Sequence, residues 1–467
     1  MLFNSFKFLF FFLPFVLFIS ARLKGQRLLA WVTLSSFFFY AFAGHAWFLI
    51  PMLTTTVFDF LLAQKIAKAK TSWSKKSLLL LSVCGNLGLL FYFKYSGLLA
   101  TSFFYLSHFF YGTQGDAGRL FAVILPAGIS FYTFQTLSYI IDVYRGKAEP
   151  ETNFWCFASF VSFFPHLVAG PLTRHNQLIP ALKKIESGGI SPRWQEGIFL
   201  FVIGLSKKVL LADRIANLID PIIADISHSG FILSWLAIIG YALQIYFDFS
   251  GYTDMAIGLG RLFGIELPKN FNSPYQAINP SDFWTRWHIT LSRWLRDYLY
   301  IPLGGNRHGR LNRYRNVMIT MILGGLWHGA NWTFAAWGLY HGTLLVAYYS
   351  IKPYWDKQSI PLQKITTFIC VCFGWVFFRS ANLLESIQWL TNLFGLNGFE
   401  VTLPMIDVAK LAILLIFGLL ITNLKLNASH FEGFRRLNWT QEMVLGAIAV
   451  IAVVFMNYSS SFLYFQF

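Results

Sequence analysis

Charged residues are scarce in this sequence of 467 residues: they make up 12% of it, whereas hydrophobic residues make up 56%. A water-soluble core cannot hide that much apolar surface, so the composition excludes an ordinary soluble enzyme. Because a helix of about 20 apolar residues crosses a bilayer, the long apolar runs predict transmembrane helices. We predict one all-α, multi-pass membrane domain over residues 1–467, with about eleven spans and additional re-entrant helices.

Acidic residues are also few, since 21 Asp and Glu stand against 37 Lys and Arg, a net charge of +16. The basic residues lie between apolar runs, so membrane orientation explains them better than a nucleic-acid partner does. The basic loops at 22–27 and 65–76 alternate with a short uncharged turn near residue 45. This alternation predicts an N-terminus outside the cytoplasm and both basic loops inside it. Residues 1–20 lack a small-residue cleavage site and are predicted to remain as the first span.

Cysteine is rare, and its four positions lack the paired spacing of a zinc site or a disulfide framework. We therefore predict packing roles for Cys84, Cys156, Cys370 and Cys372, with no metal centre and no bound cofactor. The sequence also lacks a G-x-S-x-G nucleophile elbow, an H-E-x-x-H zinc helix and a Walker phosphate loop. These absences weigh against a serine hydrolase, a zinc protease and an ATP-driven pump.

Two segments are too polar or too broken to be ordinary spans, although strong spans flank them: residues 162–175 and 267–315. Irregular backbone at membrane depth is tolerated only where protein buries it or where it lines a cavity. We therefore expect the chemistry of the protein in or near these two segments.

Two histidines lie in the apolar and aromatic run MILGGLWHGANWTFAAWGLYHG: His328 and His341. An ionisable group in such a run is expensive to bury and suggests a functional site. Gly324, Gly325 and Gly329 flank His328 and would allow backbone or substrate to approach closely. A neutral imidazole there can take a proton from a hydroxyl nucleophile. A structural histidine, hydrogen-bonded between helices, explains the pattern equally well.

Arginines and aromatic residues alternate in DFWTRWHITLSRWLRDYLYIPLGGNRHG, residues 282–309. Helical spacing predicts that Arg286, Arg293 and Arg296 share one face, with His288 turned away from it. Such a face suits a phosphate-bearing donor, because guanidinium groups make bidentate contacts with phosphate. An interfacial amphipathic helix with snorkelling arginines explains the same pattern.

Two carboxylates, Asp248 and Asp254, lie in or near a predicted span. Acidic residues at membrane depth usually pair with cations. We predict that both form structural ion pairs with the arginines that follow them in the sequence.

Several long motifs resemble one protein family and occur in its order over nearly the whole chain. They are GISFYTFQTLSYIIDVYRG, FFPHLVAGPLTR, FDFSGYTDMAIGLGRLFGIELPKNFNSPY, the arginine-rich segment, GGLWHGANWTFAAWGLYHG and the final FLYFQF. The sequence resembles the membrane-bound O-acyltransferases, in the bacterial branch of the alginate and peptidoglycan O-acetyltransferase membrane subunits. The resemblance implies a ring of helices around a pinched central channel. It maps His328 onto the family's catalytic histidine and His288 onto its second characteristic histidine.

The resemblance also implies substrates, partners and a location. The donor, expected to be acetyl-CoA, would enter from the cytoplasm of a bacterium, and the acceptor would approach His328 from outside the inner membrane. The residues expected to bind the donor are Arg286, Arg293, Arg296, Trp327 and Asn331. A periplasmic or membrane-anchored SGNH-type partner would place the acetyl group on a polysaccharide such as alginate or peptidoglycan.

The sequence leaves several mechanisms open. His328 would act as a general base, while His288 orients the donor or stabilises the oxyanion. Transfer through a covalent acyl group on a Ser, Thr or Tyr is an alternative. The alternative functions are an acyl-group transporter or flippase, a scaffold subunit without chemistry of its own, and D-alanyl transfer to teichoic acid.

Overall fold

A computed structural model of the protein describes residues 1–111, 123–424, 437–458, 460 and 462–463. These residues form helices joined by turns and irregular segments, and no strand occurs among them. Five helical stretches in this described part are long and apolar enough to cross a membrane: Ala46–Lys68, Ser72–Tyr111, Phe231–Leu262, Ile360–Arg379 and Met405–Asn423. The prediction of an all-helical, multi-pass membrane protein is therefore confirmed. The last four residues of the FLYFQF motif, 464–467, lie outside the described residues.

The chain divides into two compact units. Unit 1 comprises Met1–Phe201 and Met255–Pro268, and unit 2 comprises Val202–Asp254 and Lys269–Phe467. The helices α9 (Trp194–Ser206) and α11 (Phe231–Leu262) each run from one unit into the other. That the whole chain acts as a single functional domain stays a prediction.

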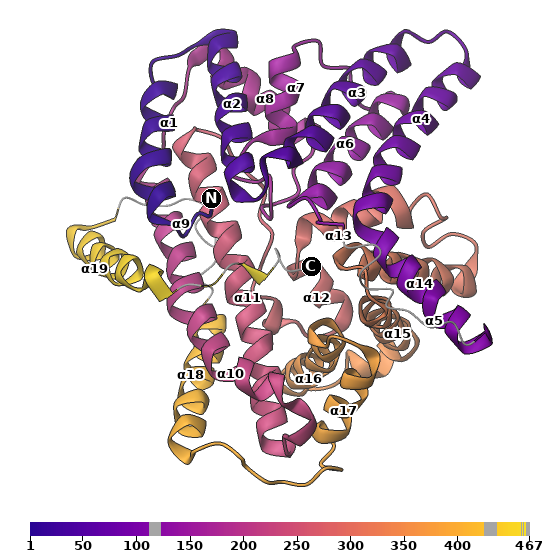
Figure 1. Ribbon diagram of the computed structural model, residues 1–467, viewed down its shortest axis with the longest axis vertical. Helices are drawn as coiled ribbons and strands as arrows, with labels where there is room; N and C mark the ends of the chain where they lie inside the picture. Colours follow the sequence, from indigo (N-terminus) through magenta and orange to yellow (C-terminus); the bar gives the residue numbers. More distant parts are fainter. Residues whose placement is uncertain (112–122, 425–436, 459, 461, 464–467) are drawn as a thin grey trace. The chain divides into compact units, whose positions relative to one another are not determined.

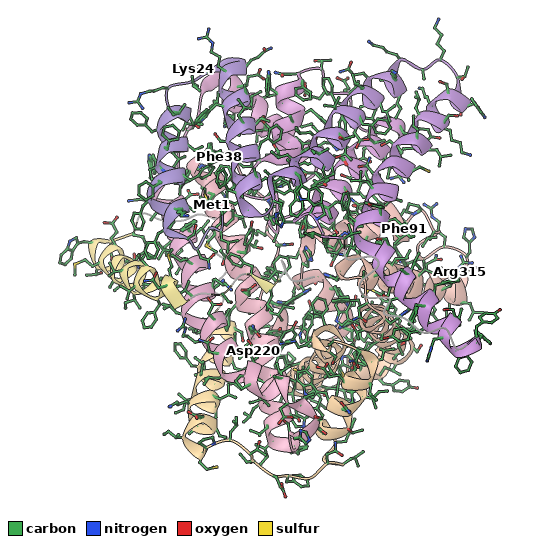
Figure 2. All side chains as sticks on the ribbon, in the orientation of Figure 1. Met1, Lys24, Phe38, Phe91, Asp220 and Arg315 are labelled. Carbon is green, nitrogen blue, oxygen red and sulfur yellow. The ribbon has the colours of Figure 1, made fainter. Side chains whose placement is uncertain are left out.

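Unit 1 contains mainly antiparallel helices (Figure 1). Its other helices are α1 (Leu13–Ser20), α2 (Gly25–Ala43), α3 (Leu49–Lys68), α4 (Ser72–Leu90), α5 (Ser96–Tyr111), α6 (Ile129–Tyr144), α7 (Phe154–Ser162) and α8 (His175–Gly188). Helix α2 packs against α7 and α8, and α3 packs against α4 and α6. The α1–α2 turn, which contains Lys24, and the α3–α4 turn, which contains Lys70, lie at the same end of the unit (Figures 1 and 2). The two basic loops therefore share a side, as the charge pattern predicts.

The irregular segment between α7 and α8 is buried inside unit 1, since residues 163–173 are all buried. Two of its polar groups find partners on the helices around it. The Gln135 side chain donates to the Thr173 hydroxyl (3.0 Å), and the Phe164 amide donates to the Ser36 hydroxyl (3.1 Å). This segment meets the condition that broken backbone at membrane depth must be covered by protein and hydrogen-bonded.

Unit 2 holds the second broken segment and the helices around it. The remaining helices are α10 (Asp213–Ala224), α12 (Pro280–Arg286), α13 (Ile289–Leu295), α14 (Gly309–His328), α15 (Trp332–Trp355), α16 (Ile360–Arg379), α17 (Leu383–Leu393), α18 (Met405–Asn423) and α19 (Trp439–Phe455). Helices α14 and α15 form a hairpin, and α15 packs in turn against α12 and α16.

The two helices of this hairpin touch backbone to backbone at two glycines. A Cβ atom on Gly325 of α14 would lie 2.2 Å from the carbonyl oxygen of Phe334. One on Gly338 of α15 would lie 2.3 Å from the carbonyl oxygen of Met321. No side chain can occupy either space without a shift of backbone, so the glycines near His328 serve the close crossing of two helices.

We predict that Gly338→Ala separates α14 from α15 and destabilises the protein. Overpacking of this kind costs about 1–3 kcal/mol, which should lower the thermal unfolding temperature in detergent by several degrees. The matched control is Gly446→Ala in α19, where an added Cβ meets nothing within 4 Å. Equal unfolding temperatures for the two variants would show that the crossing tolerates a methyl group.

Candidate active site

His328 lies at the end of α14 inside an aromatic enclosure. Its side chain is buried, and the centroids of the Trp327, Trp337 and Phe378 rings lie 5.0, 5.1 and 5.3 Å from that of the imidazole. The helix stops here because Gly329 adopts an extended backbone conformation. A Cβ atom on Gly329 would meet the Phe334 ring at 2.0 Å, so glycine is required at this turn. Gly329 thus allows the chain to turn immediately after His328.

His288 lies 6.2 Å from His328, measured between ring centroids, although 40 residues separate them. It is fully buried and forms the turn between α12 and α13 in a left-handed conformation with φ of +41°. Non-glycine residues rarely adopt this conformation, and it costs on the order of 1–3 kcal/mol. Asn270 supports the turn, because its side-chain oxygen accepts from the amide (3.2 Å) and hydroxyl (2.9 Å) of Thr290. The Phe249 ring, from α11, packs against the imidazole in a T-shaped arrangement, with 4.8 Å between the ring centroids.

The expected single arginine face is wrong, because the chain turns at His288 instead of continuing as one helix. Arg286 belongs to α12, where its Nε donates to Asp282 (2.8 Å) and its Nη1 donates to the Asn272 carbonyl (3.3 Å). Arg293 lies in α13, after the turn. The structure therefore separates Arg286 from the other two arginines and engages it in local contacts.

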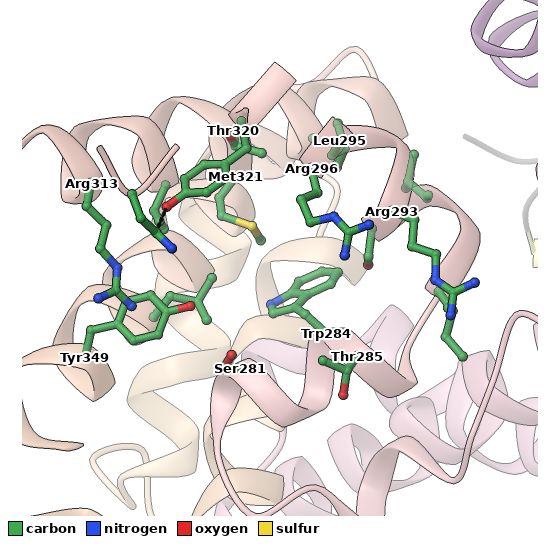
Figure 3. Close-up of a pocket in the computed structure, with 18 of the residues that line it drawn as sticks. Ser281, Trp284, Thr285, Arg293, Leu295, Arg296, Arg313, Thr320, Met321 and Tyr349 are labelled. Carbon is green, nitrogen blue, oxygen red and sulfur yellow. Dashed lines mark hydrogen bonds between the residues drawn. The ribbon is translucent and has the colours of Figure 1, made fainter. Parts of the chain in front are cut away.

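A cavity of about 450 Å³ in unit 2 brings His328 together with several arginines. Its lining includes Trp284, Arg293, Arg296, Arg313 and His328. Figure 3 shows Arg296 next to Trp284 and Arg313 beside the Tyr349 ring, whereas Arg293 points away from Trp284. A volume of this size is typical of small-molecule sites.

Sequence reasoning missed Arg313, which lies one turn into α14. Its guanidinium lies 3.8 Å from the centroid of the Tyr349 ring, on which it stacks (Figure 3). The only signal in the sequence was its place just beyond the arginine-rich segment. Arg296 Nε donates a hydrogen bond to the Asp297 carboxylate (2.8 Å), and this bond raises the pKa of the guanidinium.

The cavity connects the buried imidazole to a strongly basic end of unit 2. Fifteen residues of α14 separate Arg313 from His328, a rise of about 22 Å at about 1.5 Å per residue. The start of α14, the end of α15 and the start of α16 meet at this basic end. These helix ends and the loops beside them carry Arg307, Arg310, Arg313, Arg315, Lys352, Lys357 and Lys364. The positive-inside rule predicts that this end faces the cytoplasm.

The other residues predicted for the site have different surroundings. Trp327 packs against the rings of both His328 and His288. Asn331 begins α15 by accepting from the Thr333 amide (3.1 Å) and donates to the Ala381 carbonyl (2.7 Å), at the end of the hairpin remote from Arg313. Whether Trp327 and Asn331 contact a donor stays a prediction.

His341, the second histidine of the apolar run, is enclosed by aromatic rings. It stacks on Phe283 and packs against Trp284 and Trp337. A Cβ atom on Gly374 would lie 2.5 Å from its Nε2, so this glycine makes room for the imidazole. These contacts are those of a packing residue: His341 supports the tryptophans that lie between its own ring and His328.

The buried carboxylates of α11 form ion pairs, but with lysines instead of the predicted arginines. Asp248 Oδ1 lies 2.6 Å from Lys208 Nζ, and Asp254 Oδ2 lies 2.6 Å from Lys207 Nζ. The two lysines begin a π-helical turn, Lys207–Ala212, that precedes α10. All four side chains are at most 5% exposed, so the pairs are structural, as expected, and they tie α11 to this turn.

Removal of one partner of such a pair should be more damaging than removal of both. Asp254→Leu removes the carboxylate that lies 2.6 Å from the buried Lys207 ammonium, which costs about 3–5 kcal/mol. Lys207→Met with Asp254→Leu removes both charges of this pair. We therefore expect a large drop in the thermal unfolding temperature for the single variant and a partial recovery for the double variant. Asp407→Leu, in the exposed pair with Lys410, is the control and should have little effect. Equal drops for the single and double variants would refute this assignment.

Comparison with known proteins places this region in a family. The membrane-bound O-acyltransferase family matches residues 151–387, which include both histidines and the whole cavity lining. A peptidoglycan O-acetyltransferase of Helicobacter pylori is 35% identical, over 100% of this chain and 98% of that protein. A probable alginate O-acetylase of Pseudomonas putida is 37% identical, over 100% of both chains. A teichoic acid D-alanyltransferase of Bacillus subtilis is 29% identical, over 54% of this chain and 68% of that protein.

Proposed function

Because the chain belongs to the membrane-bound O-acyltransferase family, we propose that it passes acetyl groups from cytoplasmic acetyl-CoA across the bacterial inner membrane. The acetyl groups then O-acetylate an extracytoplasmic polysaccharide. The acceptor is a glycan by analogy with the names of the two whole-length relatives, which act on peptidoglycan and alginate. The observation that carries the proposal is the cavity that joins Arg296 and Arg313 to His328.

The cavity suits a donor with phosphates at one end and a thioester at the other. The guanidinium groups of Arg296 and Arg313 can bind the phosphates of coenzyme A, and the Trp284 ring of the same cavity offers a face for stacking. The basic end of unit 2 is where a cytoplasmic donor would enter. The long separation between Arg313 and His328 lets an extended pantetheine arm carry the acetyl group to the imidazole.

His328 provides the proton transfer that an acyl transfer to a hydroxyl needs. A neutral imidazole nitrogen takes the proton of the acceptor hydroxyl. At the same time, the hydroxyl oxygen attacks the carbonyl carbon of the acetyl group. The carbon–sulfur bond then breaks, and the coenzyme A thiolate receives that proton. His288, 6.2 Å away between ring centroids, orients the donor or stabilises the oxyanion.

The acceptor approaches from the end of unit 2 opposite the arginines. There α14 ends at His328, α15 begins, and α16 ends beside Phe378. In this proposal a periplasmic or membrane-anchored SGNH-type partner receives the acetyl group at that end and places it on the glycan. The similarity to a teichoic acid D-alanyltransferase covers about half of this chain.

We predict that His328→Ala abolishes acetyl transfer while the fold stays intact. Loss of a general base typically costs about 10²–10⁴-fold in rate. The measurement is release or transfer of label from radiolabelled acetyl-CoA by protein in nanodiscs, with and without periplasmic partners.

His108→Ala, at an exposed position in α5, is the matched control for that measurement and should retain full activity at equal thermal stability. A transporter without chemistry predicts only a gradual weakening in the His328 variant, and a scaffold subunit predicts none. Donor turnover in the His328 variant equal to that of the wild type would therefore refute the proposed role.

We predict that Arg296→Ala and Arg313→Ala each raise the KM for acetyl-CoA about tenfold, since a charge-assisted hydrogen bond contributes about 1.5–3 kcal/mol. The same variants should affect acetyl-pantetheine much less, because it lacks the adenosine phosphates. Lys68→Ala, at an exposed position at the end of α3, is the control. Equal losses with both donors would mean that the arginines do not bind phosphate.

A further inference from the structure

A groove of about 830 Å³ lies in unit 1 between the first helical stretch of the chain and α2. One wall is the π-helical turn Phe8–Phe12 with the start of α1, and the other wall is α2. Met1 and Phe38, which both line the groove, are labelled in Figure 2. We call this space the N-terminal groove. Most of its lining is aromatic: Phe10, Phe11, Phe12, Phe15, Trp31 and Phe38.

The local sequence widens the first helical stretch at the groove. The Leu13 amide donates to the carbonyl of Phe8, five residues back, and Pro14, which also lines the groove, has no amide to donate. Phe11 and Phe15 project outward and are more than half exposed. Single π-helical turns of this kind occur frequently at functional sites.

The lining suits a lipid chain better than a partner helix. Helices that associate within a membrane meet at Gly, Ala, Ser and Thr, which let their backbones approach closely. Among the described residues that line the groove, Ser35 is the only one of these types, and bulky rings surround it. A flexible acyl chain can instead follow the gaps between the rings and make dispersion contacts with them.

The length of the groove also matches an acyl chain. Lys7 and Val16 line it nine residues apart, a rise of about 14 Å at about 1.5 Å per residue. This length is about half of the hydrocarbon thickness of about 30 Å, which is the depth that one acyl chain fills.

Lys7 gives the groove a positive charge at one end. Its side chain is exposed, and none of the described residues that line the groove carries a carboxylate. The first 58 residues of the chain contain no Asp or Glu. The phosphate of a lipid can supply the missing negative charge. Lys7 would repel the ammonium of an ethanolamine lipid, so the charge favours an anionic headgroup.

Ser35 offers a second polar contact inside the groove. It is 5% exposed, and its hydroxyl has no hydrogen-bonding partner among the described residues. A buried hydroxyl without a partner is costly, so an acceptor from a ligand would stabilise it. The ester carbonyls of a phospholipid are such acceptors, and they lie between the phosphate and the acyl chains. The order of groups in the lipid therefore matches Lys7, Ser35 and the aromatic wall.

We propose that the N-terminal groove binds one anionic phospholipid, with its phosphate at Lys7, an ester carbonyl at Ser35 and one acyl chain along the aromatic wall. The basic turn that contains Lys24 lies at the other end of α1. Because the charge pattern predicts that this turn is cytoplasmic, the lipid belongs to the extracytoplasmic leaflet. The site is independent of acyl transfer, since it lies in unit 1, whereas His328 and its cavity lie in unit 2.

The test is native mass spectrometry of the full-length protein, released from nanodiscs that contain equal parts of phosphatidylglycerol and phosphatidylethanolamine. We expect each wild-type chain to retain one phosphatidylglycerol. Lys7→Glu should lower the affinity for this lipid at least about tenfold in a titration, because it replaces an attraction to the phosphate with a repulsion. Lys70→Glu makes the same charge change at an exposed position in the α3–α4 turn, and this control should bind like the wild type.

A second pair of variants tests the aromatic wall. Phe11 and Phe103 are both 73% exposed, but Phe103 lies in α5, away from the groove. Phe11→Ala should therefore weaken retention of the lipid, and Phe103→Ala should leave it unchanged. The thermal unfolding temperatures of all four variants in the same nanodiscs check that each one is folded.

Three results would overturn the site. The first is equal retention of phosphatidylglycerol and phosphatidylethanolamine, or of a diacylglycerol that lacks the phosphate. The second is an affinity for phosphatidylglycerol that Lys7→Glu and Phe11→Ala both leave unchanged. The third is a co-purified protein that Phe11→Ala releases, which would assign the groove to a partner helix instead.

Discussion

The close crossing of α14 and α15 at Gly325 and Gly338 is the constraint on which the site depends. Backbone contact between the helices places Trp337 against His328 and lets the hairpin end immediately behind the imidazole. Both sides of that enclosure are then determined by the same hairpin. One side leads along α14 to the arginines, and the other faces the end of α16. A wider separation of the helices would loosen the enclosure of His328 and both approaches to it together.

The bilayer imposes the second constraint, because broken backbone at membrane depth must be buried and paired. The left-handed turn at His288 satisfies it through Asn270, whose side chain holds Thr290. Behind this turn, α11 is tied by the Lys208–Asp248 pair, and the next residue, Phe249, packs on the His288 ring. The buried ion pair and the strained turn, both of which are energetically costly, therefore lie close to the two histidines. Such concentration is expected of a functional site rather than of a part that only stabilises the fold.

The local sequence is enough to predict the features of this site that depend on composition. It is not enough to predict the features that depend on where the chain turns. The helical class and the two broken segments follow from polarity, and the two histidines from an apolar context and a family resemblance. The arginine face fails because nothing in the residues around His288 forbids a continuous helix, so only the packed structure reveals the turn. The partners of Asp248 and Asp254 were missed for a similar reason. Lysines 40 or more residues upstream become neighbours only through the packing of α11 against a π-helical turn.

The central claim is that one cavity carries an acyl donor from the basic end of unit 2 to His328. The most direct measurement is an electron cryomicroscopy structure of the protein in nanodiscs with a non-hydrolysable acetyl-CoA analogue. The account predicts the phosphates of the analogue at Arg296 and Arg313, and its acetyl carbonyl within hydrogen-bonding reach of the His328 imidazole. An analogue bound outside this cavity, or one whose acetyl group points away from His328, would contradict the account.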